Sequence, residues 1–287
     1  MRRYVRRGAA LLGAGAAMVM LVIGAGPGGA EPASAAGSLT MVALGDSSAA
    51  GPLVGTQNSL DCLRSSSNWP TVAARALGAH LTDVTCSGAT TADLTGKRFG
   101  YIAPQLDAVT ADTDIVTLAI GANDINMGGT VVGCTQPLPE PYGVSCKSWM
   151  TAGGDTTDAQ LAAVRPKIVD AVNRIHAKAP GATVNLVGYL RYWDETGCYP
   201  TDPIWAVDAE WLQSIFDRTN AMIRQAAAES GAGYIDIATP STGHGVCAPY
   251  ASKWVEGLIP TSAAAPYHPN QSGMDAAGAV VASAIGG

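Results

Sequence analysis

The sequence predicts a single domain of the α/β class, with three layers in which helices cover both faces of a central, mostly parallel sheet. Short apolar runs alternate along the chain with longer segments of helical periodicity. The apolar runs are mostly continuous in hydrophobicity, which is typical of parallel strands buried on both faces. Such alternation favours right-handed crossovers, which place the loops that follow the strands along one edge, where ligands usually bind.

Four apolar runs are predicted strands. They are LTMVAL (39–44), IVTLAI (115–120), TVNLVGY (183–189) and GYIDI (233–237). Their lengths are those of strands rather than of helices. A further strand is expected to end near Cys86, just before Gly88.

Four other segments are predicted helices, namely residues 68–79, 158–180, 209–231 and 270–286. Asn68 is the expected N-cap of the first helix, and Gly78 lies near its end. Pro166 lies inside the second segment and predicts either two helices or one kinked helix. The third segment is strongly amphipathic and stops at Gly231.

Two regions do not fit a minimal α/β unit. Residues 128–154 are expected to form a long loop that holds Cys134 and Cys146, and residues 194–208 form a second one, rich in proline and aromatic side chains. Long loops without regular structure tend to be functional. If disulfides staple these loops, they can rim a cleft rather than move freely.

The first 35 residues have the pattern of a secretory signal peptide. Four arginines within residues 2–7 precede an apolar run over residues 8–26, and Ala33-Ser34-Ala35 has the A-x-A form of a cleavage site. We expect cleavage near Ala35/Ala36, which leaves one domain over 36–287 and an extracellular protein. A membrane anchor is the alternative, but the cleavage pattern and the lack of a second long apolar run argue against it.

Charge and composition restrict the classes of partner. The net charge is −6, and the basic residues are scattered rather than clustered, which argues against nucleic-acid binding. We expect a monomer without a stable membrane anchor, and no metal or other cofactor.

The cysteines number six, an even count that suggests three disulfides in an exported protein. Six cysteines can pair in many ways, and their order along the chain suggests pairing between neighbours: Cys62–Cys86, Cys134–Cys146 and Cys198–Cys247. A zinc site is the alternative, since His244 and Cys247 lie three residues apart. The absence of a Cys-x-x-Cys pair makes zinc the weaker interpretation.

Ser47 directly follows the first predicted strand and opens a tight turn or helix. In that position its Oγ lies at the carboxyl end of the strand, and its own N–H and the helix dipole face the same space. Gly45-Asp46-Ser47 alone is more typical of an ordinary turn. Asp46 is expected to brace this turn rather than to act as an acid.

Two further blocks could supply hydrogen-bond donors. Gly88 follows a predicted strand, and a glycine there offers an unobstructed N–H, although it also suits any strand-to-helix turn. Asn123 follows the strand at 115–120, and its amide could donate to an oxyanion, although it could equally cap a helix. With the N–H of Ser47 these groups would make a three-donor oxyanion hole.

His268 stands in a loop just before the last helix and is the expected base for the serine. The other histidines fit this role less well. His80 falls at a turn and His176 lies within a charged helix, so His244 is the one rival base.

Together the four blocks resemble the SGNH-hydrolase superfamily, also called GDSL lipases and esterases. They are Gly45-Asp46-Ser47, Gly88, Gly121-Ala122-Asn123-Asp124 and His268-Pro269, and they span almost the whole chain after residue 36. The cysteines and the N-terminus resemble the secreted actinobacterial branch. The resemblance implies a flavodoxin-like fold, Ser47 and His268 as catalytic residues, and an oxyanion hole of Ser47, Gly88 and Asn123. It also implies three sequential disulfides, in agreement with the pairing above.

One departure from the family pattern concerns the base. Most members carry an aspartate three residues before the histidine, where this chain has Ala265. Members of the resembled branch use a backbone carbonyl instead, and the resemblance assigns that role to the carbonyl of Ala265. A carbonyl can set the tautomer of His268, although it supplies no charge.

The resemblance implies a secreted carboxylic ester hydrolase, an esterase or lipase in a branch that also contains phospholipases, acting on small-molecule or lipid esters. A carbohydrate deacetylase of the acetyl-xylan type is the alternative, and a non-catalytic, disulfide-stapled binding module is the alternative from a different class. Large apolar side chains near the expected cleft loops suit an acyl chain, although most would equally suit core packing. They are Leu53, Tyr142, Trp149, Trp193, Tyr199, Trp205 and Trp254.

Overall fold

The computed structural model describes residues 39–194 and 196–287, which form one compact unit. The predicted signal peptide over residues 1–35 lies outside the described residues. Five parallel strands form the central sheet in the order β4-β1-β5-β6-β7. Their bounds are β1 Thr40–Gly45, β4 His80–Asp83, β5 Ile115–Ala119, β6 Thr183–Val187 and β7 Gly233–Ile235. The predicted α/β class and parallel sheet are confirmed.

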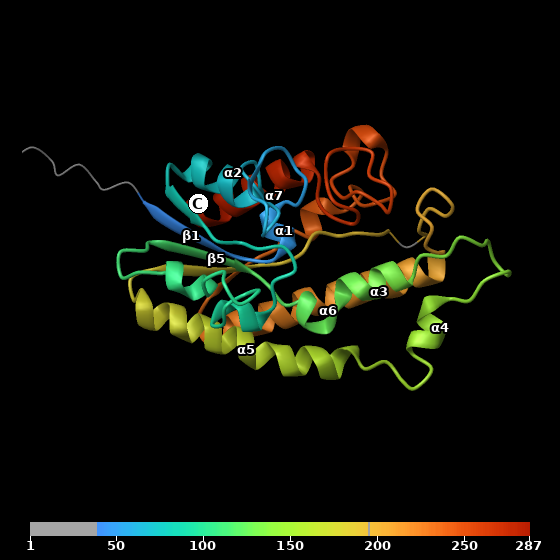
Figure 1. Ribbon diagram of the computed structural model, residues 1–287, viewed down its shortest axis with the longest axis horizontal. Coiled ribbons are helices and arrows are strands. Elements are labelled where there is room, and N and C mark those ends of the chain that lie inside the picture. Colours follow the sequence, from blue (N-terminus) through green and yellow to red (C-terminus); the bar gives the residue numbers. More distant parts are fainter. Residues whose placement is uncertain (1–38, 195) are drawn as a thin grey trace, which may run out of the picture. The chain divides into compact units, whose positions relative to one another are not determined.

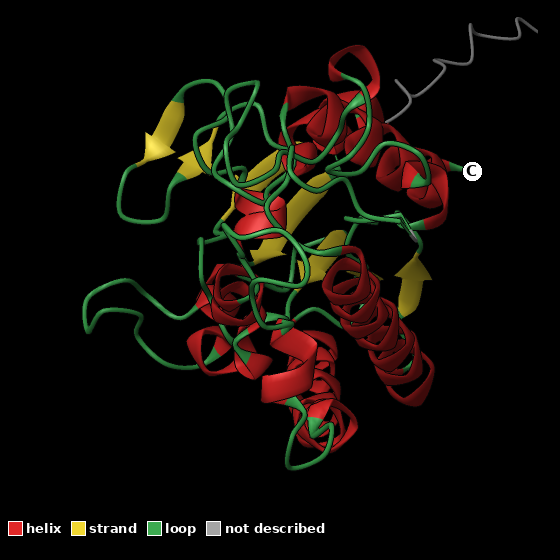
Figure 2. Cartoon of the chain, turned by 90° about the vertical axis from the view of Figure 1, so that its right-hand side faces the viewer, coloured by secondary structure: helices red, strands yellow, loops and turns green. Residues whose placement is uncertain are grey.

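Helices cover both faces of this sheet (Figure 1). The helices α2 and α7 pack together on one face, and α5 and α6 pack together on the other. Their bounds are α2 Trp69–Leu77, α5 Thr157–Lys178, α6 Ala206–Ser230 and α7 Gln271–Gly286. The small hairpin of β2 (Gln57–Ser59) and β3 (Arg64–Ser65) lies apart from the main sheet (Figure 2).

The helix α5 is continuous through Pro166, so of the two predicted alternatives the division into two helices is wrong and a single helix is observed. Its buried face runs across the proline, with Leu161 and Val164 before it and Ile168 after it. Proline removes one backbone hydrogen bond from a helix. Packing of the apolar face against α6 offsets that loss.

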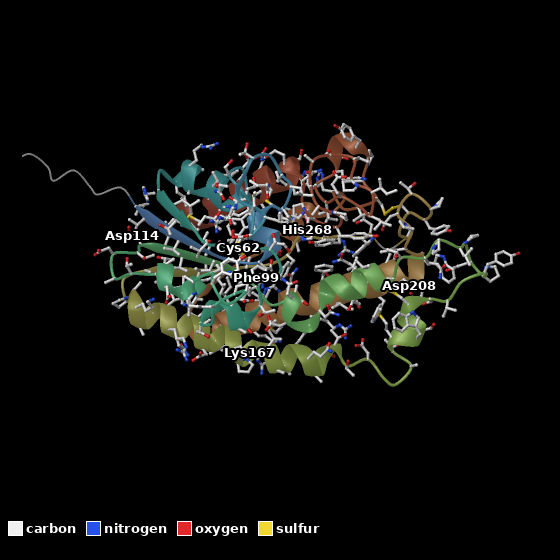
Figure 3. The ribbon with its side chains drawn as sticks, in the orientation of Figure 1. Cys62, Phe99, Asp114, Lys167, Asp208 and His268 are labelled. Atoms are coloured by element: carbon white, nitrogen blue, oxygen red, sulfur yellow. A yellow bond between two sulfur atoms is a disulfide. The ribbon has the colours of Figure 1, made fainter. Side chains whose placement is uncertain are left out.

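The region 128–154, expected to be one long loop, contains two short helices. They are α3 (Met127–Gly133) and α4 (Cys146–Met150), and the Cys134–Cys146 disulfide joins the end of one to the start of the other. The buried carboxylate of Asp208 on α6 accepts the N–H groups of Cys146 and Lys147 at 3.2 and 3.0 Å, which fixes the start of α4 (Figure 3). Sequence periodicity is a poor guide to helices this short, because one disulfide and one buried cap determine them.

The structure pairs the cysteines in the predicted order. Cys62 is bonded to Cys86 and Cys198 to Cys247, in addition to the pair beside α3. The Cys62–Cys86 disulfide holds the β2–β3 hairpin against the segment that follows β4. The remaining short elements are α1 (Ser47–Ala50), η1 (Thr91–Leu94), η2 (Gln105–Ala108), η3 (Asn123–Ile125), η4 (Thr239–Ser241) and η5 (Tyr250–Ser252).

Candidate active site

Ser47 is the first residue of α1 and follows the carboxyl end of β1 after a single intervening residue. That residue, Asp46, is the N-cap, and its Oδ1 accepts the N–H of Ser48 at 2.9 Å and the hydroxyl of Ser48 at 2.8 Å. Gly45 has φ +148°, and a Cβ there would stand 2.5 Å from the carbonyl oxygen of Ala119. Only glycine lets β1 approach β5 this closely before the chain turns into α1.

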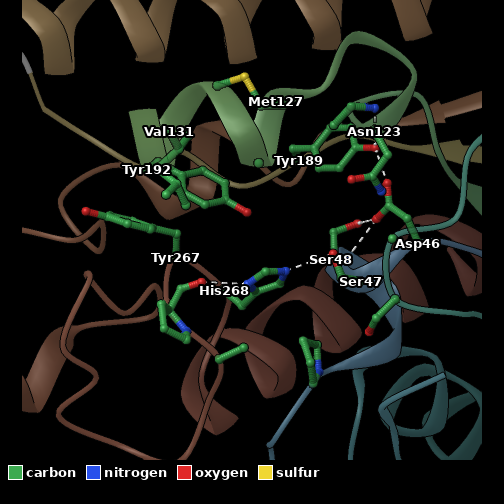
Figure 4. A pocket seen from close by; sticks show the side chains of 18 of the residues that line it. Asp46, Ser47, Ser48, Asn123, Met127, Val131, Tyr189, Tyr192, Tyr267 and His268 are labelled. Atoms are coloured by element: carbon green, nitrogen blue, oxygen red, sulfur yellow. Dashed lines mark hydrogen bonds between the residues drawn. The ribbon is translucent and has the colours of Figure 1, made fainter. Parts of the chain in front are cut away.

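The imidazole of His268 joins Ser47 to a backbone carbonyl. Its Nε2 lies 2.8 Å from the Oγ of Ser47, and its Nδ1 lies 2.8 Å from the carbonyl oxygen of Pro266 (Figure 4). A carbonyl only accepts, so the proton belongs on Nδ1 and Nε2 is left to accept from the serine hydroxyl. Burial lowers the pKa of His268 below its ordinary value, and the hydrogen bond to Pro266 partly opposes this effect.

The carbonyl that orients the imidazole belongs to Pro266, and the assignment to Ala265 is wrong. The carbonyl of Ala265 instead accepts the backbone N–H of His268 at 3.2 Å and closes a turn. Tyr267 inside this turn has φ +56°. Because the Ala265 carbonyl is hydrogen-bonded within this turn, the next carbonyl along the chain, that of Pro266, contacts the imidazole of His268.

Gly88 and Asn123 line the same cleft as Ser47 and His268. Gly88 has φ +76°, and a Cβ there would stand 2.8 Å from the Nη2 of Arg98, so both conformation and space favour glycine. The Nδ2 of Asn123 donates to the carbonyl of Ala89 at 3.0 Å, which fixes the amide and leaves its second hydrogen free. The structure thus brings all four sequence blocks to one edge of the sheet.

The N–H groups beside the serine are also placed as donors. Among the described residues, neither the N–H of Ser47 nor that of Gly88 donates to another protein group. Both residues line the cleft. Two N–H groups without partners at the start of a helix and in a glycine turn are the kind of donors that an oxyanion hole requires.

The cleft has a volume of about 440 Å³ and is mainly apolar. Met127, Val131 and Val132 of α3 form one wall. Tyr192 and Phe216 line the cleft as a stacked pair, with their ring centroids 4.1 Å apart. Pockets of this size and composition bind small organic molecules or acyl chains.

None of the seven large apolar side chains predicted near the cleft lines it. Trp193 and Trp205 are buried elsewhere, and Tyr142 and Trp149 are exposed. Part of the apolar lining comes instead from α3, which the sequence predicted to be part of a loop. The alternative interpretation of these side chains, as core or loop packing, is the better one for most of them.

His244, the rival base, lies outside the cleft lining. Its ring stacks on Trp254 at a centroid distance of 4.0 Å, and its Nδ1 lies 2.6 Å from the carbonyl oxygen of Ser252. Within residues 39–194 and 196–287, no group of three or more His, Cys, Asp or Glu side chains is placed to hold a metal ion. In the same part of the chain, no helix has both the length and the apolar character to cross a bilayer.

Two carboxylates brace the site, and for Asp46 this is the role expected from the sequence. Asp124 accepts the N–H of Thr91 at 2.9 Å and also its hydroxyl, which ties the turn after β5 to η1. Asp46 is 1% exposed, and burial raises its pKa to about 6. Its Oδ2 accepts the hydroxyl of Tyr189 at 2.6 Å. Sequence reasoning missed Tyr189, although its place at the end of the predicted strand 183–189 puts it at the same edge of the sheet.

Comparison with known proteins gives consistent results. Residues 43–276 match the model of the GDSL-like lipase/acylhydrolase family. Lipase 2 of Streptomyces coelicolor is 39% identical over 254 residues, which cover 85% of each chain. Two crystal structures superpose with a TM-score of 0.71 at 26% identity, covering 86% of this chain and 99% of theirs: phospholipase A1 from Streptomyces albidoflavus and an extracellular lipase from Streptomyces rimosus.

Proposed function

The chain belongs to the GDSL-like lipase/acylhydrolase family and is an ester hydrolase of the lipase and esterase type, and we propose that Ser47 and His268 carry out its reaction. The observation that carries this proposal is the 2.8 Å contact between Ser47 Oγ and His268 Nε2, with the Nδ1 of the same ring on the Pro266 carbonyl. The two contacts support this proposal because a serine nucleophile needs a neighbouring base in the correct tautomer, and both residues line the apolar cleft.

In the first step Nε2 of His268 removes the proton of Ser47 as the Oγ attacks the ester carbonyl carbon. The carbonyl oxygen gains the negative charge of the tetrahedral intermediate. The N–H groups of Ser47 and Gly88 and the free amide hydrogen of Asn123 stabilise this charge. Collapse of the intermediate breaks the ester C–O bond, and His268 returns its proton to the leaving alcohol.

The second step removes the acyl group from Ser47. A water molecule loses a proton to His268 and attacks the acyl carbon, and the same three donors stabilise the second oxyanion. Proton return to the Oγ releases the carboxylic acid. The Pro266 carbonyl keeps the imidazole in one tautomer throughout, but, unlike a carboxylate, it brings no charge to the imidazolium.

The substrate proposed is a carboxylic ester with an acyl chain of several carbons. The apolar walls formed by α3 and by the Tyr192–Phe216 pair favour such a chain over a polar sugar. The similar structure described as a phospholipase A1 adds phospholipids to the substrates worth testing.

A series of p-nitrophenyl esters of increasing acyl length, set beside acetylated xylan, tests the substrate class. We expect faster hydrolysis of the medium or long esters than of the acetate, and little release of acetate from xylan. Activity restricted to acetyl groups would instead support the deacetylase alternative. Failure of the pure protein to hydrolyse any of these esters would favour a non-catalytic binding module.

We also propose that the protein is secreted as a monomer after loss of residues 1–35, leaving a hydrolase domain over 36–287. Three disulfides among the described residues support an oxidising compartment. The N-terminal sequence of protein recovered from the culture medium should begin near Ala36. Retention of the full chain inside the cell, or a dimer in light scattering, would contradict the respective part of this proposal.

A further inference from the structure

A buried tyrosine outside the four sequence blocks connects two of the three segments that carry the proposed oxyanion donors. Tyr189 lies just past β6, lines the cleft and is 2% exposed. Its hydroxyl donates to Oδ2 of Asp46 at 2.6 Å and accepts the N–H of Ala122 at 3.0 Å (Figure 4). These two partners immediately precede Ser47 and Asn123 in the chain.

The tyrosine is itself held firmly by α6. The side-chain amide of Asn220 accepts the backbone N–H of Tyr189 at 2.8 Å and donates to its carbonyl oxygen at 3.0 Å. The ring of Phe216 meets the tyrosine ring edge-on, at a centroid distance of 6.1 Å. A phenol fixed at its backbone and its ring presents the hydroxyl at one position relative to the sheet.

The hydrogen bonds around this hydroxyl converge on the carboxylate of Asp46. The N–H of Ala122 donates to the phenol oxygen, the phenol donates to Asp46, and the other oxygen of Asp46 accepts from the backbone and hydroxyl of Ser48. Buried chains of this kind strengthen each bond and are sensitive to the loss of any member. Without the hydroxyl, a buried N–H and a buried carboxylate oxygen would both lose a partner.

We propose that Tyr189 is a positioning residue that sets the separation between the Ser47 turn and the Asn123 turn, and therefore the geometry of the oxyanion hole. The inference rests on the proposed roles of Ser47 and Asn123. Oxyanion donors act only when they are aimed at the position that the oxyanion will occupy. A displacement of about 1 Å in a catalytic arrangement costs about 10²-fold in rate.

Replacing Tyr189 by phenylalanine tests this role, because it removes the hydroxyl and keeps the ring in the cleft wall. Active sites are titrated with an organophosphorus ester, and kcat is expressed per titrated site. We expect kcat per site to fall about 10- to 100-fold while KM changes less than about threefold. A change that only destabilised the fold would lower the number of titratable sites and leave kcat per site unaltered.

Tyr199→Phe is a matched control. It also removes one hydroxyl hydrogen bond, to the carbonyl of Pro137 at 3.2 Å, but it lies outside the cleft lining and should keep full kcat. Asp46→Asn is a second variant if Tyr189→Phe does not fold. Only one end of the asparagine side chain accepts hydrogen bonds, so it cannot serve both the Tyr189 hydroxyl and the Ser48 donors, and a loss of kcat per site is again expected.

The two possible failures can be distinguished. A kcat per site within about twofold of wild type in Tyr189→Phe or Asp46→Asn would overturn the positioning role and leave the proposed function intact. Absence of both ester hydrolysis and organophosphorus labelling in the wild-type protein would overturn the proposed function itself.

Discussion

Ser47 stands at the carboxyl end of a buried parallel strand, whereas His268 lies in a loop outside the sheet. The serine turn is fixed by its neighbours in the sheet: Gly45 packs against Ala119, and the Asp46 N–H donates to the Ala119 carbonyl at 2.9 Å. The histidine loop is fixed by scattered side chains. Two halves of one reacting pair can thus be held by different kinds of structure.

The histidine loop depends on two buried carboxylates. Asp202, in the segment stapled by Cys198–Cys247, accepts the hydroxyl of Tyr267 at 3.0 Å, directly before the histidine. Glu256 accepts from Asn270, the N-cap of α7, at 2.8 Å, and its own N–H donates to the carbonyl of His268 at 3.0 Å. Because carboxylates hold the loop rather than the imidazole, the base has a fixed position without a charged partner.

Replacing His268 by alanine should cause the largest loss of turnover of any substitution in the loop that carries the histidine. Ser47 would then have no base within reach, and turnover of a p-nitrophenyl ester should fall on the order of 10⁴- to 10⁶-fold. The midpoint of thermal unfolding should change little, because the imidazole lines the cleft and is not part of the hydrophobic core. Retention of more than about a hundredth of the wild-type kcat would show that another group acts as base.

Asn123→Ala tests the opposite side of the cleft. Loss of one oxyanion donor should lower kcat about 10²- to 10³-fold, with KM nearly unchanged, since the amide acts on the charge that develops during attack. The variant also loses the hydrogen bond to the Ala89 carbonyl. Measurement of kcat and KM on one ester tests the assignment. A raised KM with normal kcat would assign Asn123 to substrate binding instead of oxyanion stabilisation.

The pH profile reports the environment of the imidazole. His268 must be neutral to act as a base, so kcat/KM should rise with pH through its pKa and be lost as pH falls below it. Burial holds this pKa below the ordinary value of 6.5, and a carbonyl partner does not raise it as a carboxylate would. The acid limb is therefore expected below pH 6.5. A midpoint above 6.5 would point to a negative charge acting on the ring.

Tyr267→Phe should give the smallest effect, because it weakens a brace rather than a reacting group. Loss of the hydroxyl removes one of the hydrogen-bond donors to Oδ1 of the buried Asp202. A lost hydrogen bond to a charged group costs about 1.5–3 kcal/mol of stability. Thermal unfolding should show the loss directly, with kcat reduced only a few-fold. An unchanged midpoint would mean that the loop does not depend on this contact.

The two regions also differ in how far sequence predicts them. Ser47, Gly88 and Asn123 all follow parallel strands, and sheet topology alone brings such positions to one edge. The Pro266 carbonyl was misassigned to Ala265 because a turn, and not the spacing of residues, decides which carbonyl meets the ring. The wall formed by α3 was missed because this helix has only seven residues and two adjacent glycines, which leave too short a periodic pattern to recognise.

Covalent labelling with an organophosphorus ester tests the central claim, that Ser47 is the nucleophile activated by His268, most directly. The digested wild-type protein should carry the phosphoryl group on Ser47 alone when peptides are sequenced by mass spectrometry. Ser47→Ala should take up no label, and His268→Ala should label far more slowly. Label on any other residue, or undiminished labelling of Ser47→Ala, would contradict the account.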